Sequence, residues 1–145
     1  MAAITQQYNA AILNIGNGKV NASTDTFKVM LVNNYTFNVA HNTLNDVLPW
    51  EIEEEAGYVS GGVVLQNTQW FVFGSNTQLT ADSPSIAPVG TTLPDCTGAV
   101  VYSDTSTEKN LLTYIDFGET VSITVGNDLL LTILSDGIIN VSRNP

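Results

Sequence analysis

The last third of the chain, from Ala99 to Ser142, is patterned almost throughout as antiparallel β-structure. Its clearest segment runs from Val121 to Val125 and alternates apolar and polar side chains, as a strand with one solvent-exposed face does. Gly126-Asn127 has the glycine-first order of a type II′ turn, and Asp136-Gly137 is a favoured pair for a type I′ turn. These features predict a β-meander over 99–142.

Composition favours the same fold class for the whole chain. Val, Ile and Thr make up 42 of the 145 residues, and these branched side chains suit pleated, half-buried strands. A chain of this length buries roughly 68–70% of its unfolded surface, which is enough for one core without a second domain. We therefore expect a single mainly β domain over 1–145, sandwich or barrel-like, with one N-terminal α-helix.

The chain carries fourteen acidic residues against four basic ones, giving a formal net charge of −10. Nucleic-acid binding depends on clustered Lys and Arg, so this balance argues against DNA or RNA as a partner. Anionic membranes repel such a charge, and no apolar run approaches the roughly 18 residues of a spanning helix. The N-terminal residues lack the pattern of a signal peptide, and Cys96 has no second cysteine to pair with. We expect a soluble protein, made in a cytosol and folded without disulfides.

An amphipathic helix is expected within residues 1–18. Ile4, Tyr8, Ile12 and Ile15 recur at helical spacing, and Gly16 follows where a helix would end. The apolar stripe must be covered either by the sheet of its own chain or by a neighbouring subunit.

Three strands are expected before the meander. The segment Thr24–Asn34 carries apolar side chains on both faces, which is typical of a central strand. Gly61-Gly62 is expected to bend the chain into a strand over Val63–Gln66, and an aromatic strand should follow over Trp70–Phe73.

The remaining segments are expected to be irregular. Residues Thr43–Trp50 suit a short helical turn stopped at Pro49. Residues 81–98 contain Pro84, Pro88 and Pro94, which exclude a central strand and favour an extended surface loop or edge segment. A loop of this length is usually functional or bound to a partner.

No arrangement of residues for nucleophilic catalysis stands out. His41 is the single histidine, so a catalytic device would combine it with Cys96 or a serine. No Gly-x-Ser-x-Gly motif supports one, and a histidine in a polar loop fits the pattern better. We predict no catalytic residues and no cofactor.

The acidic residues are also better explained as surface charges than as metal ligands or catalytic acids. Glu51, Glu53, Glu54 and Glu55 form the densest acidic run, but it lacks the spacing of a calcium loop and suits a solvated face or a contact with basic groups of a partner. Asp116 and Glu119 could lie close enough for glycosidase chemistry, although close spacing of acids is common in β proteins. We predict no metal site.

Aromatic residues on strands pack in cores more often than they bind sugars. A carbohydrate-stacking platform would draw on Trp50, Trp70, Phe71, Phe73, Tyr102 and Tyr114. Trp50, which lies between Pro49 and the acidic run, is the best candidate for an exposed anchor.

Short motifs in a fixed order, over nearly the whole chain, resemble a group of small virion proteins of tailed bacteriophages. They are Tyr8-Asn9, Thr24–Val32 with Tyr35-Thr36, Gly57–Gly62, Ala99–Tyr102 with Asp104, and Leu111–Gly118. Members resemble capsid decoration (cement) proteins, which sit on the outside of the shell, commonly as trimers. The resemblance implies the major capsid protein as partner and assembly in the host bacterial cytoplasm, and it supplies no active-site residues.

We therefore expect a structural protein that binds the outer surface of a phage head and stabilises the shell as a homotrimer. The segment Met1–Ile4 and the loop 81–98 are expected to grip the capsid. Two alternatives remain: a tail or fibre adhesin that holds a host glycan through Trp50, and a small hydrolase using His41 or an acid pair. The candidate interface residues are Ile4, Tyr8, Ile12, Ile15, Trp50, Pro84, Pro88 and Pro94.

Overall fold

The computed structural model describes residues 4–133 and 137–142, with 38% of the structure in strands and 10% helical, which confirms the mainly β class. The helices are α1 (Ala10–Gly16) and two short 3-10 helices, η1 (Leu44–Asp46) and η2 (Leu48–Trp50). No helix in the described ranges has the length and hydropathy of a membrane span. The strands are β1 (Ile4–Gln7), β2 (Phe27–Val32), β3 (Val63–Val64), β4 (Gln69–Phe73), β5 (Asn76–Thr80), β6 (Ser85–Ile86), β7 (Cys96–Ser103), β8 (Leu111–Val121), β9 (Leu129–Leu130) and β10 (Ile139–Ser142).

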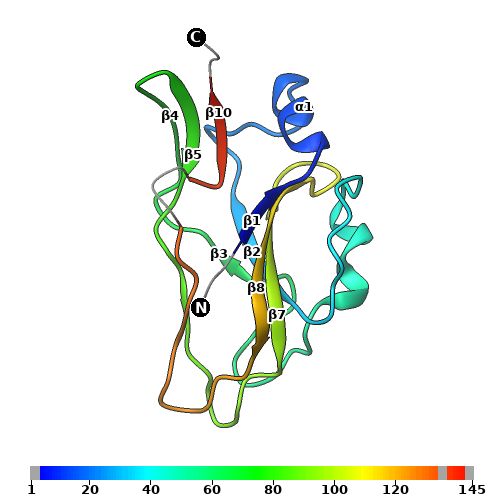
Figure 1. The fold of residues 1–145 in the computed structure, drawn as a ribbon, viewed down its shortest axis with the longest axis vertical. Coiled ribbons are helices and arrows are strands. Elements are labelled where there is room, and N and C mark those ends of the chain that lie inside the picture. Colours follow the sequence, from blue (N-terminus) through cyan, green and yellow to red (C-terminus); the bar gives the residue numbers. More distant parts are fainter. Residues whose placement is uncertain (1–3, 134–136, 143–145) are drawn as a thin grey trace.

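The largest sheet has five antiparallel strands in the order β1-β8-β7-β2-β3 (Figure 1). Its β2 strand confirms the prediction of a strand with two buried faces. Phe27, Val29 and Leu31 pack into one core, while Met30 and Val32 pack into another on the opposite face.

Because both faces of this sheet are covered, the molecule has three layers (Figure 1). One core lies between the sheet and two smaller sheets, β10-β5-β4 and β6-β9, and includes Phe27, Leu79 and Ile139. The other core lies under segment 35–50 and includes Tyr8, Tyr35 and Tyr114. The described sheets are open, each with two edge strands, which corresponds to the sandwich-like form of the predicted fold.

The predicted meander is correct for β7 and β8 but wrong beyond Val121. The strand β9 pairs with β6, and β10 pairs with β5, so both leave the main sheet. Residues 122–125 are not a strand: the chain turns there, and the Asn127 N–H donates to the Thr124 carbonyl at 3.1 Å. Of the predicted buried face, Val121 and Ile123 pack against the core but Val125 is exposed, because long-range pairing decides the sheet that a segment joins. The predicted Asp136-Gly137 turn includes Asp136, which lies outside the described residues.

The predicted N-terminal stripe is also wrong. Residues Ile4–Gln7 form β1 and pair with β8, and the helix begins only at Ala10. The Ile4 side chain is 63% exposed, while Tyr8 is completely buried and α1 buries Ala11 and Asn14. A short helix is marginal by itself, whereas the edge of β8 offers β1 a ready ladder of backbone hydrogen bonds.

Gly61 and Gly62 form the predicted bend, with φ of +96° and +92°. A Cβ on Gly62 would collide with the carbonyl oxygen of Val29, so glycine is required there. The following strand β3 is shorter than expected, while β4 confirms the aromatic strand. Segment 43–50 is helical as predicted, but Pro49 lies inside η2 and does not stop a helix before it.

Loop 81–98 is only partly the surface segment that was predicted. It includes β6 and the start of β7, and its Ile86, Pro88 and Leu93 side chains are buried. The loop therefore contributes to the core as well as to the surface.

Candidate interaction surface

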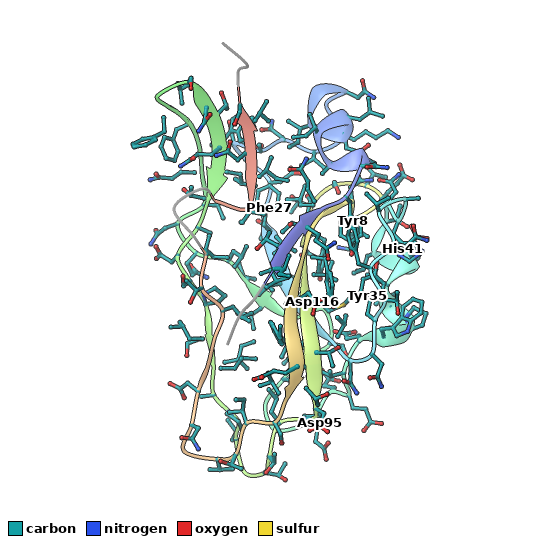
Figure 2. All side chains as sticks on the ribbon, viewed as in Figure 1. Tyr8, Phe27, Tyr35, His41, Asp95 and Asp116 are labelled. Atoms are coloured by element: carbon teal, nitrogen blue, oxygen red, sulfur yellow. The ribbon has the colours of Figure 1, made fainter. Side chains whose placement is uncertain are left out.

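His41 is held in a chain of hydrogen bonds with two tyrosines (Figure 2). The Tyr8 hydroxyl donates to the Tyr35 hydroxyl at 3.1 Å, and the Tyr35 oxygen lies 2.7 Å from Nδ1 of His41. Which of these two atoms donates depends on the tautomer of His41. The ring of Trp50 completes the group, with its centroid 5.2 Å from that of Tyr35. These contacts fasten segment 35–50 onto the main sheet.

Cys96 lies apart from this group, in the core on the opposite face of the sheet. Its thiol is buried, and burial raises the pKa of Cys96 to about 11. A thiol with such a pKa is almost entirely protonated at neutral pH and is a poor nucleophile. The structure therefore places Cys96 and His41 on opposite faces of the main sheet.

The acidic run divides into Glu51, which is bound within the fold, and three exposed residues, of which Glu54 accepts a hydrogen bond from the Ser60 N–H at 3.2 Å. Glu51 accepts hydrogen bonds from the Tyr58 hydroxyl at 2.9 Å and from the Gly61 N–H at 2.7 Å. Glu53, Glu54 and Glu55 are exposed. Within the described ranges, no group of three or more His, Cys, Asp or Glu side chains is placed to hold a metal ion.

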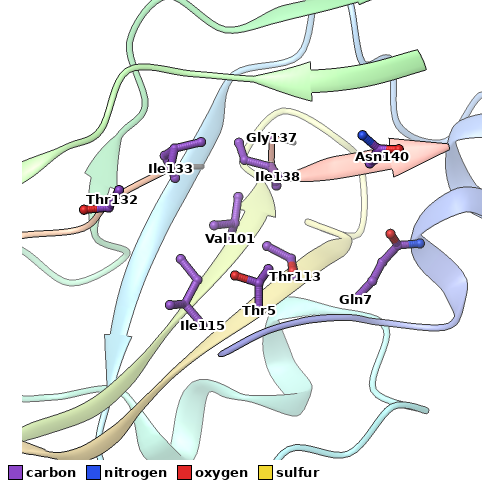
Figure 3. Close-up of a pocket in the computed structure, with 10 residues that line it drawn as sticks. All are labelled: Thr5, Gln7, Val101, Thr113, Ile115, Thr132, Ile133, Gly137, Ile138 and Asn140. Atoms are coloured by element: carbon purple, nitrogen blue, oxygen red, sulfur yellow. The ribbon is translucent and has the colours of Figure 1, made fainter. Parts of the chain in front are cut away.

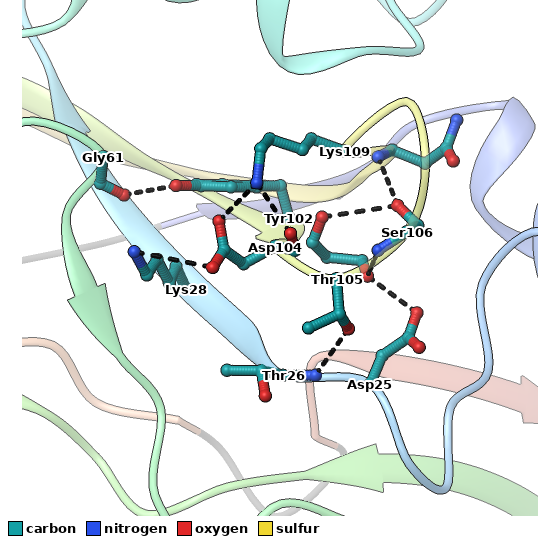
Figure 4. Close-up of polar contacts among 11 residues, drawn as sticks. Asp25, Thr26, Lys28, Gly61, Tyr102, Asp104, Thr105, Ser106 and Lys109 are labelled. Carbon is teal, nitrogen blue, oxygen red and sulfur yellow. Dashed lines mark hydrogen bonds and ion pairs between the residues drawn. The ribbon is translucent and has the colours of Figure 1, made fainter.

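The densest ionic contacts surround Asp104, in the loop between β7 and β8 (Figure 4). Lys109 donates to the Asp104 carboxylate and to its backbone carbonyl, both at 2.7 Å, and Lys28 lies 3.6 Å from the same carboxylate. The hydrogen bond from Lys109, with the charges of both lysines, holds the pKa of Asp104 below its usual value of 3.8. The cluster ties the loop to β2, so its role is structural.

A pocket of about 210 Å³ opens between β1, β8 and residues 137–140 (Figure 3). Its lining includes Thr5, Thr113, Ile115 and Asn140, and the described residues around it contribute no ionisable side chain. The Thr113 hydroxyl is already engaged, since it donates to the Gln6 carbonyl at 2.9 Å. The described lining of the pocket therefore offers apolar contacts and neutral polar groups.

The most exposed apolar side chains of the sheets lie at the end of the β4–β5 hairpin, which projects at the upper left of Figure 1. Val72 is 71% exposed and Phe73 is 66% exposed, and Phe71 is half-buried beside them. We call these three residues the hairpin tip. This strand was predicted from the sequence but its hairpin was not, although Gly74-Ser75 between two strand-like runs is a type II′ turn signal.

The predicted interface residues differ widely in exposure. Ile4 is on the surface and Ile12 is exposed to a lesser degree, while Ile15 packs against the core. Trp50, Pro84 and Pro94 are half-buried. Tyr8 and Pro88 are buried inside the chain, so these two offer no surface to a partner.

Comparisons of the chain with protein-family models, with curated proteins and with solved structures found no match.

Proposed function

We propose that the protein is a structural virion protein of a tailed bacteriophage, which binds the outer surface of the head and stabilises the shell. The observation that carries the proposal is a contrast between two kinds of side chain. His41, Glu51, Asp104 and Cys96 are occupied within the fold or buried, whereas large apolar side chains such as Val72 and Ile4 stand in solvent. Such a surface suits binding to another protein better than it suits chemistry.

Two exposed side chains are proposed to contact the major capsid protein. Ile4 lies on the edge strand β1, and Val89 is exposed on loop 81–98. Many such contacts repeated over a shell add through avidity, so each can be weak. The charge of −10 also suits a position outside the shell, away from packaged DNA.

The test uses heads that lack the protein, to which purified protein is added. We expect the wild type to co-sediment with heads and to raise the temperature at which they release DNA. Ile4→Lys and Val89→Lys should weaken binding at least several-fold. Leu13→Lys is the control, because Leu13 is 61% exposed on α1, which lies away from loop 81–98 (Figure 1).

Point variants are preferable to deletion of loop 81–98, because the deletion would remove Ile86 and Leu93 from the core. If the wild type does not bind heads, or if decorated and bare heads release DNA at the same temperature, the proposal is wrong. Binding to host cells with no binding to heads would instead support the tail or fibre adhesin.

A further inference from the structure

The β4 strand is an edge strand without the features that usually protect an edge. It ends the sheet β10-β5-β4, and its register with β5 runs without a bulge from Gln69 to Phe73. Its five residues, Gln69-Trp70-Phe71-Val72-Phe73, include no proline and no charged side chain. Natural edge strands are commonly blocked by lysine, proline or a bulge, because an open apolar edge pairs with other strands. We propose that β4 pairs antiparallel with β4 of a second copy of this chain.

Backbone geometry defines the residues that would form this contact. The two-residue turn Gly74-Ser75, with φ of +64° at Gly74, makes Phe73 and Asn76 the closing pair of the hairpin. The two residues of a closing pair exchange backbone hydrogen bonds. Hydrogen-bonded residues alternate along a strand, so the backbone groups of Phe71 and Gln69 also bond to β5. Trp70 and Val72 therefore direct their backbone N–H and C=O groups to the free edge.

A second copy offers the complementary set of groups. When two β4 strands run antiparallel, Trp70 of each copy meets Val72 of the other, and each pair exchanges both N–H···O bonds. The two-fold axis then passes through the Phe71 pair, whose side chains lie on one face of the joined sheet. Phe73 extends the same row of aromatic side chains, and such cross-strand aromatic pairs stabilise sheets.

The distribution of charge is compatible with self-association through this surface. Two copies with a charge of −10 each repel one another, so a stable contact must keep the acids apart. No charged residue occurs between positions 56 and 81, which include the whole hairpin. Asp82, at the base of the hairpin, is hydrogen-bonded to Asn67 and would face the uncharged turn of the other copy. The inference rests on β4 alone and does not require the proposed function.

The first test measures mass by sedimentation or light scattering. We expect wild-type protein to show twice the 15.5 kDa of one chain. Val72→Lys should return the mass to that of one chain with an unchanged circular dichroism spectrum, because Val72 is exposed and its lysine would be brought close to a second lysine. The control Val125→Lys should remain dimeric. A monomeric wild type, or a dimeric Val72→Lys, would overturn the proposal. A mass of three chains would also overturn it, because it would indicate a trimer built on another surface.

The second test fixes the register by disulfide trapping. Opposed residues that do not exchange backbone bonds bring their Cβ atoms to within about 4.5–5.5 Å, close to what a disulfide spans. Phe71→Cys should therefore form a covalent dimer under mild oxidation. Phe73→Cys should not, because the two Phe73 positions lie four residues apart along the pair. Equal trapping at both positions, or none at position 71, would contradict the two-fold pairing.

Discussion

The hydroxyl oxygen of Tyr35 lies 2.7 Å from Nδ1 of His41, and the two rings stack with centroids 5.8 Å apart. Because the same hydroxyl accepts a hydrogen bond from buried Tyr8, the histidine is the outer end of a chain that begins in the core. The arrangement explains why a lone histidine in a polar loop has a fixed position.

Tyr35→Phe is expected to destabilise the fold by about 1–3 kcal/mol, since it leaves the buried Tyr8 hydroxyl without its acceptor. Urea unfolding gives the free-energy difference. Tyr114→Phe is the matched control: its hydroxyl makes no hydrogen bond to other described residues, so the loss should be under about 0.5 kcal/mol. Similar losses in the two variants would show that the Tyr8–Tyr35–His41 chain does not stabilise the fold.

Gly98→Ala is expected to destabilise the fold by about 1–3 kcal/mol, because the new Cβ would lie 2.5 Å from the ring and hydroxyl of Tyr114. Gly16→Ala provides the contrast, since a Cβ at that helical position meets open space. It should be neutral or stabilise by up to about 1 kcal/mol. Thermal unfolding of both variants measures the difference, and an unchanged Gly98→Ala would mean that the packing against Tyr114 is loose.

Asp104→Asn should make stability less dependent on acid. The folded-state pKa of Asp104 is lowered, so its stabilising effect is present above about pH 4 and is lost as pH falls through the lower folded value. We expect the variant to lose at most about 1 kcal/mol at pH 6 and almost nothing near pH 2. Denaturant titrations at both pH values measure this. A loss that is equal at the two pH values would contradict the ionic role. Asp128→Asn, at an exposed position between the turn and β9, controls for a general charge effect.

His41→Ala and Glu53→Ala should leave binding to phage heads within about two-fold of the wild type. His41 contacts the rings of Tyr35 and Trp50, and Glu53 is solvated. Co-sedimentation with heads is the measurement, with circular dichroism to verify folding. Complete loss of function in folded His41→Ala would favour the hydrolase alternative.

Local sequence patterns predicted the elements that short segments specify by themselves. β2 was predictable because apolar residues on both faces suit a central strand, and the bend at Gly61-Gly62 because only glycine accepts such φ values. The spacing of Ile4 and Tyr8 was misleading, because a strand followed by a helix can repeat the interval of one continuous helix. Periodicity cannot detect the pairing with β8 that decides this.

The candidate surface was harder to predict than the fold. Pro88 was expected at an interface because prolines mark loops, yet it lies in the interior, since a loop can cover a core. Val72 and Phe73 were expected within a strand, and their exposure follows from the projection of the hairpin beyond the core. Exposure of this kind depends on three-dimensional arrangement, which no local pattern contains.

The most direct test of the proposed function is the number of copies of this chain relative to the major capsid protein in purified particles, measured by quantitative mass spectrometry. Decoration of the head predicts hundreds of copies per particle. Absence from particles, or only a few to some dozens of copies at the tail, would contradict it.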